Sequence, residues 1–278
     1  MSDKNKKNLA KKKMKKFLSL IMTFFCALNL NAQKKLADCQ RIIISDSISV
    51  KIYKADKNSY ETSDKNISVK FKKGVLNIFR IQKMQMDVHG DTKVKGESSR
   101  PKINLYLNSK VENITITDYV SADFINGFNT KKIILKVEKN SEFSGEISAQ
   151  AFGLFLKSGS ESYLKGNFRT TKLSADSAKI EFSSFEADNS EIIVEGGSIV
   201  SIEGKTEKLN LIVSGLSRFE GLRLNAKNSI AKISGNSDVF FNTKETLNIT
   251  ASERSHIVLT GNPKIEQNVS KDCKFSKR

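Results

Sequence analysis

The sequence predicts an all-β protein built as a right-handed parallel β-solenoid, similar to a β-helix, with about seven to eight rungs of about nineteen residues. Three observations lead to this fold class. The chain contains only two prolines, apolar and polar residues alternate over much of its length, and a short serine-ended box recurs at a nearly constant interval. A repeat unit with one apolar face cannot bury that face alone, so neighbouring units must stack.

The repeat is defined by seven four-residue boxes that end in serine and follow one another at intervals of 17 to 21 residues. The positions one and three before a box are mostly apolar, as in Val137 with Leu135 and Val213 with Leu211. Such period-two alternation places these side chains on one buried strand face. Each unit is therefore expected to be a strand, a tight turn, a second strand and a loop. The final serines form the expected structural turn column: Ser141, Ser160, Ser177, Ser198, Ser217, Ser237 and Ser255.

The serine boxes have two interpretations, a catalytic one and a structural one. A nucleophilic serine needs a positioned base, and the chain has only His89 and His256. In contrast, Gly159 and Gly215 can adopt the positive φ of a tight turn, and serine hydroxyls can bond to nearby backbone. The boxes therefore favour turn formation, with no catalytic residue and no enzymatic activity expected.

Residues 1–32 have the features of a secretory signal peptide. Met14-Lys15-Lys16 precedes an apolar run, Phe17–Leu28, and Leu30-Asn31-Ala32 supplies a cleavage site. The basic stretch before Met14 is either an extended leading region or lies upstream of a true start at Met14. Removal of this segment lowers the formal charge from +17 to +10. The sequence thus predicts export to the periplasm or cell surface of a Gram-negative bacterium.

The rest of the chain divides into three predicted parts. Residues 33–110 form a strand region continuous with the solenoid, residues 111–272 form the repeats, and residues 273–278 form a tail. The exported chain has no further apolar run long enough to span a bilayer. Cys39 and Cys273 lie near its two ends, and they can pair only if their Cα atoms lie within about 7 Å.

The segment SGNSDVFFNTKETLNITASERSHIVLTGNPKIEQ, residues 234–267, resembles the C-terminal rungs of an exported bacterial family. That family is called putative auto-transporter adhesin, head GIN domain, and Gly261-Asn262-Pro263-Lys264 matches its closing segment. The resemblance covers about Arg41–Asp272. It implies a β-helix-like solenoid, a cell-envelope setting and a Bacteroidetes-like source. Most boxes have lost the family's second glycine and aspartate, as in Ser214–Ser217.

Few residues have the spacing that catalysis or metal binding requires. Met84–Asp91, with His89, either binds a soft metal such as copper or is a polar loop, and no metal or cofactor is expected. His256 in the last box is expected to be a solvated turn residue. Glu142, Glu161 and Asp238 occupy comparable positions in different rungs, so no catalytic carboxylate pair is expected from them.

Basic residues recur away from the apolar positions. They either form a stripe that attracts nucleic acid or acidic glycans, or they are solvated lysines that prevent edge-to-edge pairing. The second interpretation is favoured, so no nucleic-acid partner is expected. These residues are Lys131, Lys132, Lys165, Arg169, Lys172, Lys205, Lys208, Arg223, Lys227 and Lys232.

The sequence as a whole predicts an exported, non-enzymatic envelope or surface module that binds an unknown glycan or envelope protein along one face of the rod. Two alternatives stay open. One is a carbohydrate-active β-helix enzyme, and the other is a purely structural envelope protein.

Overall fold

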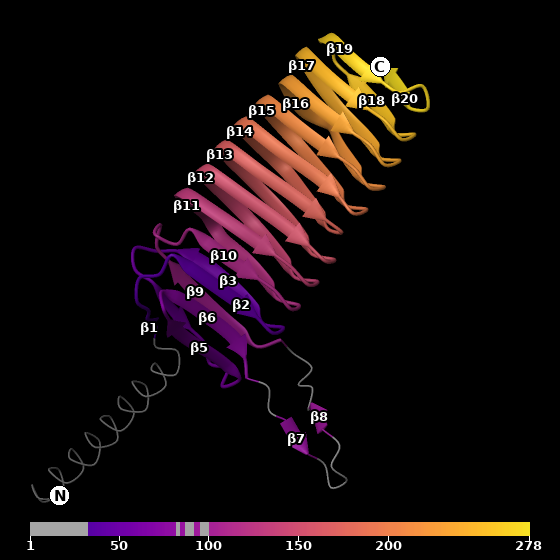
Figure 1. Ribbon diagram of the computed structural model, residues 1–278. Helices are drawn as coiled ribbons and strands as arrows, with labels where there is room; N and C mark the ends of the chain where they lie inside the picture. Colours follow the sequence, from indigo (N-terminus) through magenta and orange to yellow (C-terminus); the bar gives the residue numbers. More distant parts are fainter. Residues whose placement is uncertain (1–32, 82–83, 87–91, 95–99) are drawn as a thin grey trace, which may run out of the picture.

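A computed structural model describes residues 33–81, 84–86, 92–94 and 100–278 of the chain. In these residues every regular element is a β-strand, and the strands stack into a rod (Figure 1). The predicted signal peptide, the alternative start at Met14 and residues 87–91 of the Met84–Asp91 segment lie outside the described residues.

Seven long strands build the middle of the rod, and each pairs in parallel with the next. The repeat therefore stacks as coils of about nineteen residues, and the predicted β-solenoid is confirmed, with about nine turns rather than seven to eight. The seven strands are β11 (Ser121–Val137), β12 (Glu142–Lys157), β13 (Glu161–Asp176), β14 (Lys179–Glu195), β15 (Ile199–Val213), β16 (Arg218–Ile233) and β17 (Asp238–Ala251).

Each long strand runs through a bend that divides it into two sides. In β12 the buried side chains alternate up to Ala149, and the alternation restarts one position out of phase at Phe152. The pairing of β12 with β13 also skips Gln150, which marks the bend. We call the part between a tight turn and the bend side A, Glu142–Ala149 in β12. The part between the bend and the next tight turn is side B, Ala151–Lys157.

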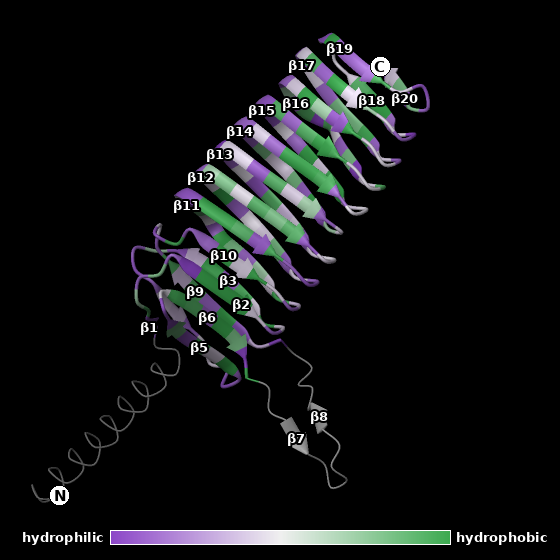
Figure 2. Ribbon diagram, viewed as in Figure 1, coloured by the Kyte–Doolittle hydropathy of each residue, from purple (hydrophilic) through white to green (hydrophobic). Residues whose placement is uncertain are grey.

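The core is one continuous column that runs along the rod. Leu135, Leu154, Leu173 and Ile192 occupy the same place on successive strands, and each is fully buried. A cluster of phenylalanines fills the interior of the middle coils, with the rings of Phe152 and Phe168 stacked at 4.6 Å between centroids. Figure 2 shows apolar residues recurring on successive strands. The apolar positions before the serine boxes therefore form the buried face that the sequence predicts.

The N-terminal strands form the first coils of the same sheet. Strand β2 pairs in parallel with β10 and β6, and β3 pairs in parallel with β11 and β9. Strands β5 and β4 pair antiparallel with β6 and β9 and cover the free edges. The bounds are β1 (Lys34–Lys35), β2 (Arg41–Ser45), β3 (Ser49–Lys54), β4 (Ser59–Glu61), β5 (Ile67–Lys72), β6 (Val75–Arg80), β9 (Lys102–Leu107) and β10 (Asn113–Ile116). Strands β7 (Met84–Met86) and β8 (Thr92–Val94) form a separate two-stranded sheet.

The C-terminal coil contains β18 (His256–Thr260), β19 (Lys264–Val269) and β20 (Lys274–Lys277). Residues 273–278, predicted as a tail, instead belong to the solenoid, because β20 pairs in register with β18. The buried Ile249 and Leu259 align with Gln267 and Lys277 in this last coil. Polar residues at these core positions allow the last coil to be exposed to solvent, as the terminal repeat of a solenoid is.

Alanine substitutions at two glycines of the same coil would show how closely the coils stack. Gly204 has a φ of 139°, and an added Cβ would lie 1.9 Å from the backbone oxygen of Phe185 on the previous coil. Gly197 has a φ of 75°, and an added Cβ would meet open space. We expect Gly197→Ala to cost about 1–2 kcal/mol of unfolding free energy, which is the cost of a left-handed backbone alone.

Gly204→Ala is expected to cost at least about 3 kcal/mol, because the clash adds to the backbone strain. Urea denaturation of both variants followed by circular dichroism measures the difference. Equal midpoints for the two variants would contradict this account of the stacking.

Candidate functional site

The predicted serine residues lie in the tight turns at one edge of the rod. Ser160, Ser198, Ser217 and Ser237 are almost completely buried. The backbone N–H of the residue that follows each serine donates a hydrogen bond to a backbone oxygen of the preceding coil. The acceptor is the residue at the serine position of that coil, as when Arg218 N donates to Ser198 O. Their hydroxyls mostly bond to backbone. For example, Ser198 Oγ accepts from Ala178 N at 3.1 Å and donates to Glu195 O.

Ser177 does not lie in this column. Only Ser177 and Ala178 separate β13 from β14, so this turn is shorter than the others. Ser177 is exposed at the tip with a φ of 53°, and Ala178 takes the position that serine has elsewhere. Including Ser177 in the column was therefore wrong, because spacing alone does not reveal a shortened turn. Ser141 and Ser255 are buried in their turns like the other serines.

The remaining predicted sites are on side A or outside the described residues. His256 lies 3.4 Å from Asp238 and packs edge-on against Phe240, and it belongs to β18 rather than to a turn. Glu142 and Glu161, expected at comparable positions of different rungs, are direct neighbours on β12 and β13. Glu161 accepts a hydrogen bond from Tyr163, which raises the pKa of that phenol.

The two cysteines of the described chain are not paired. Cys39 lies beside the N-terminal coils and Cys273 lies in the last coil, so the length of the rod separates them (Figure 1). Cys39 is buried, and desolvation raises the pKa of its thiol to about 11. Cys273 is partly exposed.

About half of the predicted basic residues form ion pairs with carboxylates, most of them on adjacent coils. Lys205 lies 2.8 Å from Glu186, and Lys172 lies 2.8 Å from Glu191. Further pairs join Lys132 to Glu112, Arg223 to Glu203, and Lys227 to both Glu207 and Glu245. Because acidic residues interrupt the basic ones along the rod, the described residues do not form a continuous basic stripe.

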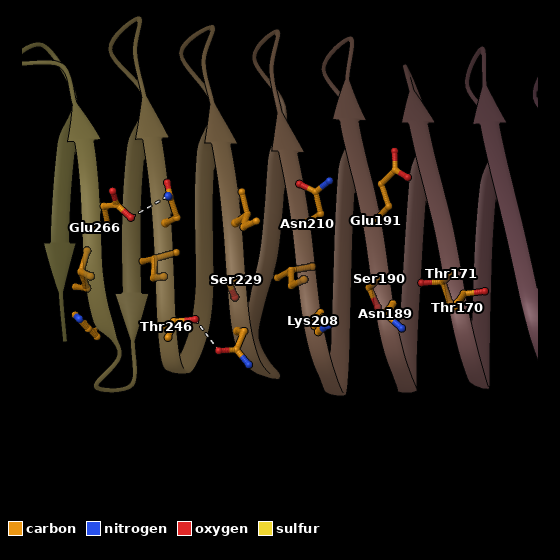
Figure 3. A pocket seen from close by; sticks show the side chains of 17 residues that line it. Thr170, Thr171, Asn189, Ser190, Glu191, Lys208, Asn210, Ser229, Thr246 and Glu266 are labelled. Carbon is orange, nitrogen blue, oxygen red and sulfur yellow. Dashed lines mark hydrogen bonds between the residues drawn. The ribbon is translucent and has the colours of Figure 1, made fainter.

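A groove of about 800 Å³ runs along side B of the second half of the rod (Figure 3). It crosses β13 to β17 and β19 at right angles to the strands. One wall consists of Thr170, Asn189, Lys208, Asn228, Thr246 and Lys264, which are paired in register. The other wall consists of Glu191, Asn210, Ile230, Asn248 and Glu266.

The floor of the groove is backbone. The residues between the two walls point inward, and Ser190, Leu209, Ser229 and Leu247 are buried. The hydroxyls of Ser190 and Ser229 bond inside the coil to Thr206 and Thr243, at 3.0 and 2.7 Å. These strands are paired with neighbours on both sides, so the floor offers few unpaired backbone groups. The hydrogen-bonding groups that the groove offers are therefore those of its walls.

None of the wall asparagines was predicted from the sequence as a binding residue. A signal was present, since Asn210 and Asn248 each stand seven positions before the last serine of a box, and Asn189 and Asn228 stand nine before. Aligning outward positions as well as inward ones on the boxes brings the four asparagines onto one face.

Comparison with known proteins identifies the family of this chain. The model of a family described as putative auto-transporter adhesin, head GIN domain, matches residues 38–202 and 174–263. Together these ranges cover well over half of the chain. The chain belongs to this family. The resemblance drawn from the C-terminal repeats is therefore confirmed, and the family is named for adhesins rather than for an enzymatic activity.

Solved structures show the same fold. A putative adhesin from Parabacteroides merdae has 11% identity and a TM-score of 0.57, covering 89% of this chain and 95% of its own. A putative adhesin from Parabacteroides distasonis has 14% identity and a TM-score of 0.59, with 89% and 96% covered.

A third structure, titled a putative lipid binding protein from Parabacteroides distasonis, has 13% identity and a TM-score of 0.60, with 89% and 96% covered. No curated protein matches the chain. In the described part of this head GIN protein, there is no helix of the length and apolarity that crossing a membrane requires.

The serine column leads to a matched pair of substitutions. Ser198 Oγ makes two hydrogen bonds, whereas Ser217 Oγ is buried without a partner among the described residues. We expect Ser198→Ala to lower the unfolding free energy by about 1 kcal/mol or more, and Ser217→Ala to be neutral or stabilising. Chemical denaturation of both variants measures this, and a larger loss for Ser217→Ala would contradict the assignment.

The cysteines lead to a difference in reactivity. At pH 8 iodoacetamide is expected to alkylate Cys273 well before Cys39, because burial keeps Cys39 as a protonated, inaccessible thiol. Mass spectrometry of peptides from the folded protein measures the two rates, and denatured protein is the control in which Cys39 must become reactive. Faster labelling of Cys39 in the folded protein would show that its end of the rod opens.

Proposed function

We propose that this head GIN protein is an exported, non-enzymatic module of the cell envelope or surface that binds a glycan or protein partner along the groove of side B. The observation that carries the proposal is the groove itself, because its walls contain hydrogen-bonding groups without partners. The side chains of Asn189, Asn210, Lys208 and Lys264 have no hydrogen bond or ion pair within the described part of the chain. The signal-peptide features of residues 1–32 support export.

The arrangement of carboxylates supports binding rather than catalysis. Glu191 and Glu266 are the carboxylates of the groove, and four strand steps of about 4.8 Å separate them by roughly 19 Å. Glycosidases place two carboxylates about 5 to 9.5 Å apart across the sugar bond. Glu191 is also paired with Lys172, and Glu266 accepts a hydrogen bond from Asn248.

The carbohydrate-active alternative depends on Glu142 and Glu161. These neighbours are closer than the groove carboxylates, but both are exposed on side A, outside the groove. The hydrogen bond from Tyr163 also engages Glu161. An enzyme that uses this pair would lose activity in Glu142→Gln and Glu161→Gln variants, whereas the binding module is expected to release no reducing ends with or without these substitutions.

Two exposed isoleucines provide a matched test of the groove. Ile230 is in the groove wall and is 54% exposed, whereas Ile199 is on side A and is 44% exposed. Ile230→Arg is expected to reduce the binding of protein-coated beads to isolated envelope material at least about fivefold, because a long charged side chain fills the groove. Ile199→Arg is expected to have little effect.

The same assay separates the alternatives. Periodate treatment of the envelope material destroys glycan partners, and protease treatment destroys protein partners, so loss of binding after one treatment identifies the class. If the wild-type protein does not bind even untreated envelope material, the purely structural role is favoured. Equal losses for the two arginine variants would also contradict binding along side B.

A further inference from the structure

The groove on side B has a regular axial geometry that limits what can occupy it. It crosses six strands, so five steps of about 4.8 Å give it a length of roughly 24 Å. Equivalent wall positions recur once per strand. An occupant that contacts the whole groove must be extended along the rod axis and must present a similar group at each step.

The free groups of the walls are mainly amides. Asn189 and Asn210 have both the oxygen and the nitrogen of the amide without a partner in the described structure. Asn228 accepts from Thr246 through its oxygen, which leaves its nitrogen free, and Asn248 donates to Glu266, which leaves its oxygen free. An amide can donate and accept at once, and hydroxyl groups are the partners that also do both.

The charges of the groove do not suit a strongly anionic polymer. Lys208 and Lys264 lie on the same wall, three strand steps or roughly 14 Å apart. Asn228 and Thr246 lie between them, and Glu191 and Glu266 lie on the facing wall. A polyanion such as nucleic acid needs a row of cations along its backbone. The groove therefore fits a neutral or weakly acidic chain.

Other classes of occupant lack the contacts that they need. A peptide that adds as a strand requires a free sheet edge, but the groove lies on a face whose strands are paired on both sides. A protein interface is usually anchored by aromatic residues and arginines, and none lines this groove. A lipid chain requires an enclosed apolar volume, whereas this groove is open and ten of its eleven wall residues have polar side chains.

We propose that the occupant is an extended, hydroxyl-rich glycan with no charge or a weak charge, its chain parallel to the rod axis and about one sugar unit on each strand. This inference rests on the proposed function and names its substrate class. The advance of an extended β-linked sugar chain per unit is close to the spacing of strands, and successive units face opposite ways. Equivalent hydroxyls therefore reach Asn189 and Asn228 on one wall and Asn210 and Asn248 on the other. Ile230 contacts the apolar face of one sugar ring.

The test uses the full chain and isothermal titration calorimetry with neutral β-linked oligosaccharides of glucose, mannose, xylose and N-acetylglucosamine, from disaccharide to octasaccharide. Affinity for at least one series is expected to rise with length and to level off near the hexasaccharide, because the groove crosses six strands. The α-linked gluco-oligosaccharides, which coil, are expected to bind at least about tenfold more weakly. Heparin is the polyanion comparison.

Asn210→Ala and Asn228→Ala are each expected to weaken binding of the hexasaccharide on the order of tenfold, the effect of one or two lost hydrogen bonds. Asn225→Ala is the matched control, since Asn225 is exposed outside the groove and pairs with Asn242 at 3.0 Å. It is expected to bind like the wild type. Circular dichroism confirms that the variants keep their fold.

Several outcomes would overturn the glycan inference. One is failure of every β-linked series to bind, and another is binding of heparin that Lys208→Ala abolishes and Asn210→Ala does not. A third is equal loss in Asn210→Ala and Asn225→Ala. If the glycans fail but Ile230→Arg still removes protease-sensitive binding to envelope material, the proposed function stands with a protein partner. If Ile230→Arg changes nothing in either assay, both proposals fail.

Discussion

The parallel backbone ladder between successive coils is the constraint on which this structure depends. Each long strand pairs with the next over almost its entire length, so a residue in one coil lies beside the residue about nineteen positions later. A coil without a neighbour leaves its backbone N–H and C=O groups unpaired and its apolar residues exposed at that edge. Stacking of another coil pairs these groups and buries these residues. Every other regularity of the rod follows from keeping this register.

The register explains why glycines and serines recur where the chain changes direction. At the tight turns, buried serines bond to backbone that has left the ladder, as Ser141 Oγ accepts from Val120 N at 3.2 Å. Beside the register shifts in the pairing of side A, Gly145 and Gly204 have φ near 139°, and backbone of the preceding coil occupies the space where a Cβ would project. These residues therefore maintain the coil. The outward positions are free to vary.

The sequence predicts the interior of this rod well because each coil repeats the same physical requirement. Val137 and Leu135, chosen from alternation alone, are fully buried, and the alignment of the C-terminal repeats identifies the family. Departures from strict periodicity were harder to predict. A turn shortened to two residues displaces Ser177, and four of the last six residues, Lys274–Lys277, become a strand because β18 offers them an edge. Neither local event leaves a periodic pattern.

The candidate site was missed for a related reason. Asn189, Asn210 and Asn228 are individually ordinary exposed polar residues, and sequence spacing places them near nine- and seven-residue offsets from different boxes. The two offsets differ by two residues on side B, so period-two alternation turns both outward, where they form the opposite walls of the groove. Glu142 and Glu161 illustrate the opposite case, since equal offsets in consecutive boxes place them side by side, as the repeat itself implies.

The two ends of the rod carry features that oppose pairing with another chain, which supports the proposal that binding takes place along side B. At the N-terminal end, β4 and β5 run antiparallel to the coils and cover their edges. At the C-terminal end, Lys264, Lys274 and Lys277 stand on the last strands, and lysine on an edge strand opposes pairing with a second chain. These features oppose end-to-end stacking of two rods, and side B exposes several coils together. A linear polymer with a similar repeat can then contact several coils at once, so weak contacts at each coil add to a specific interaction.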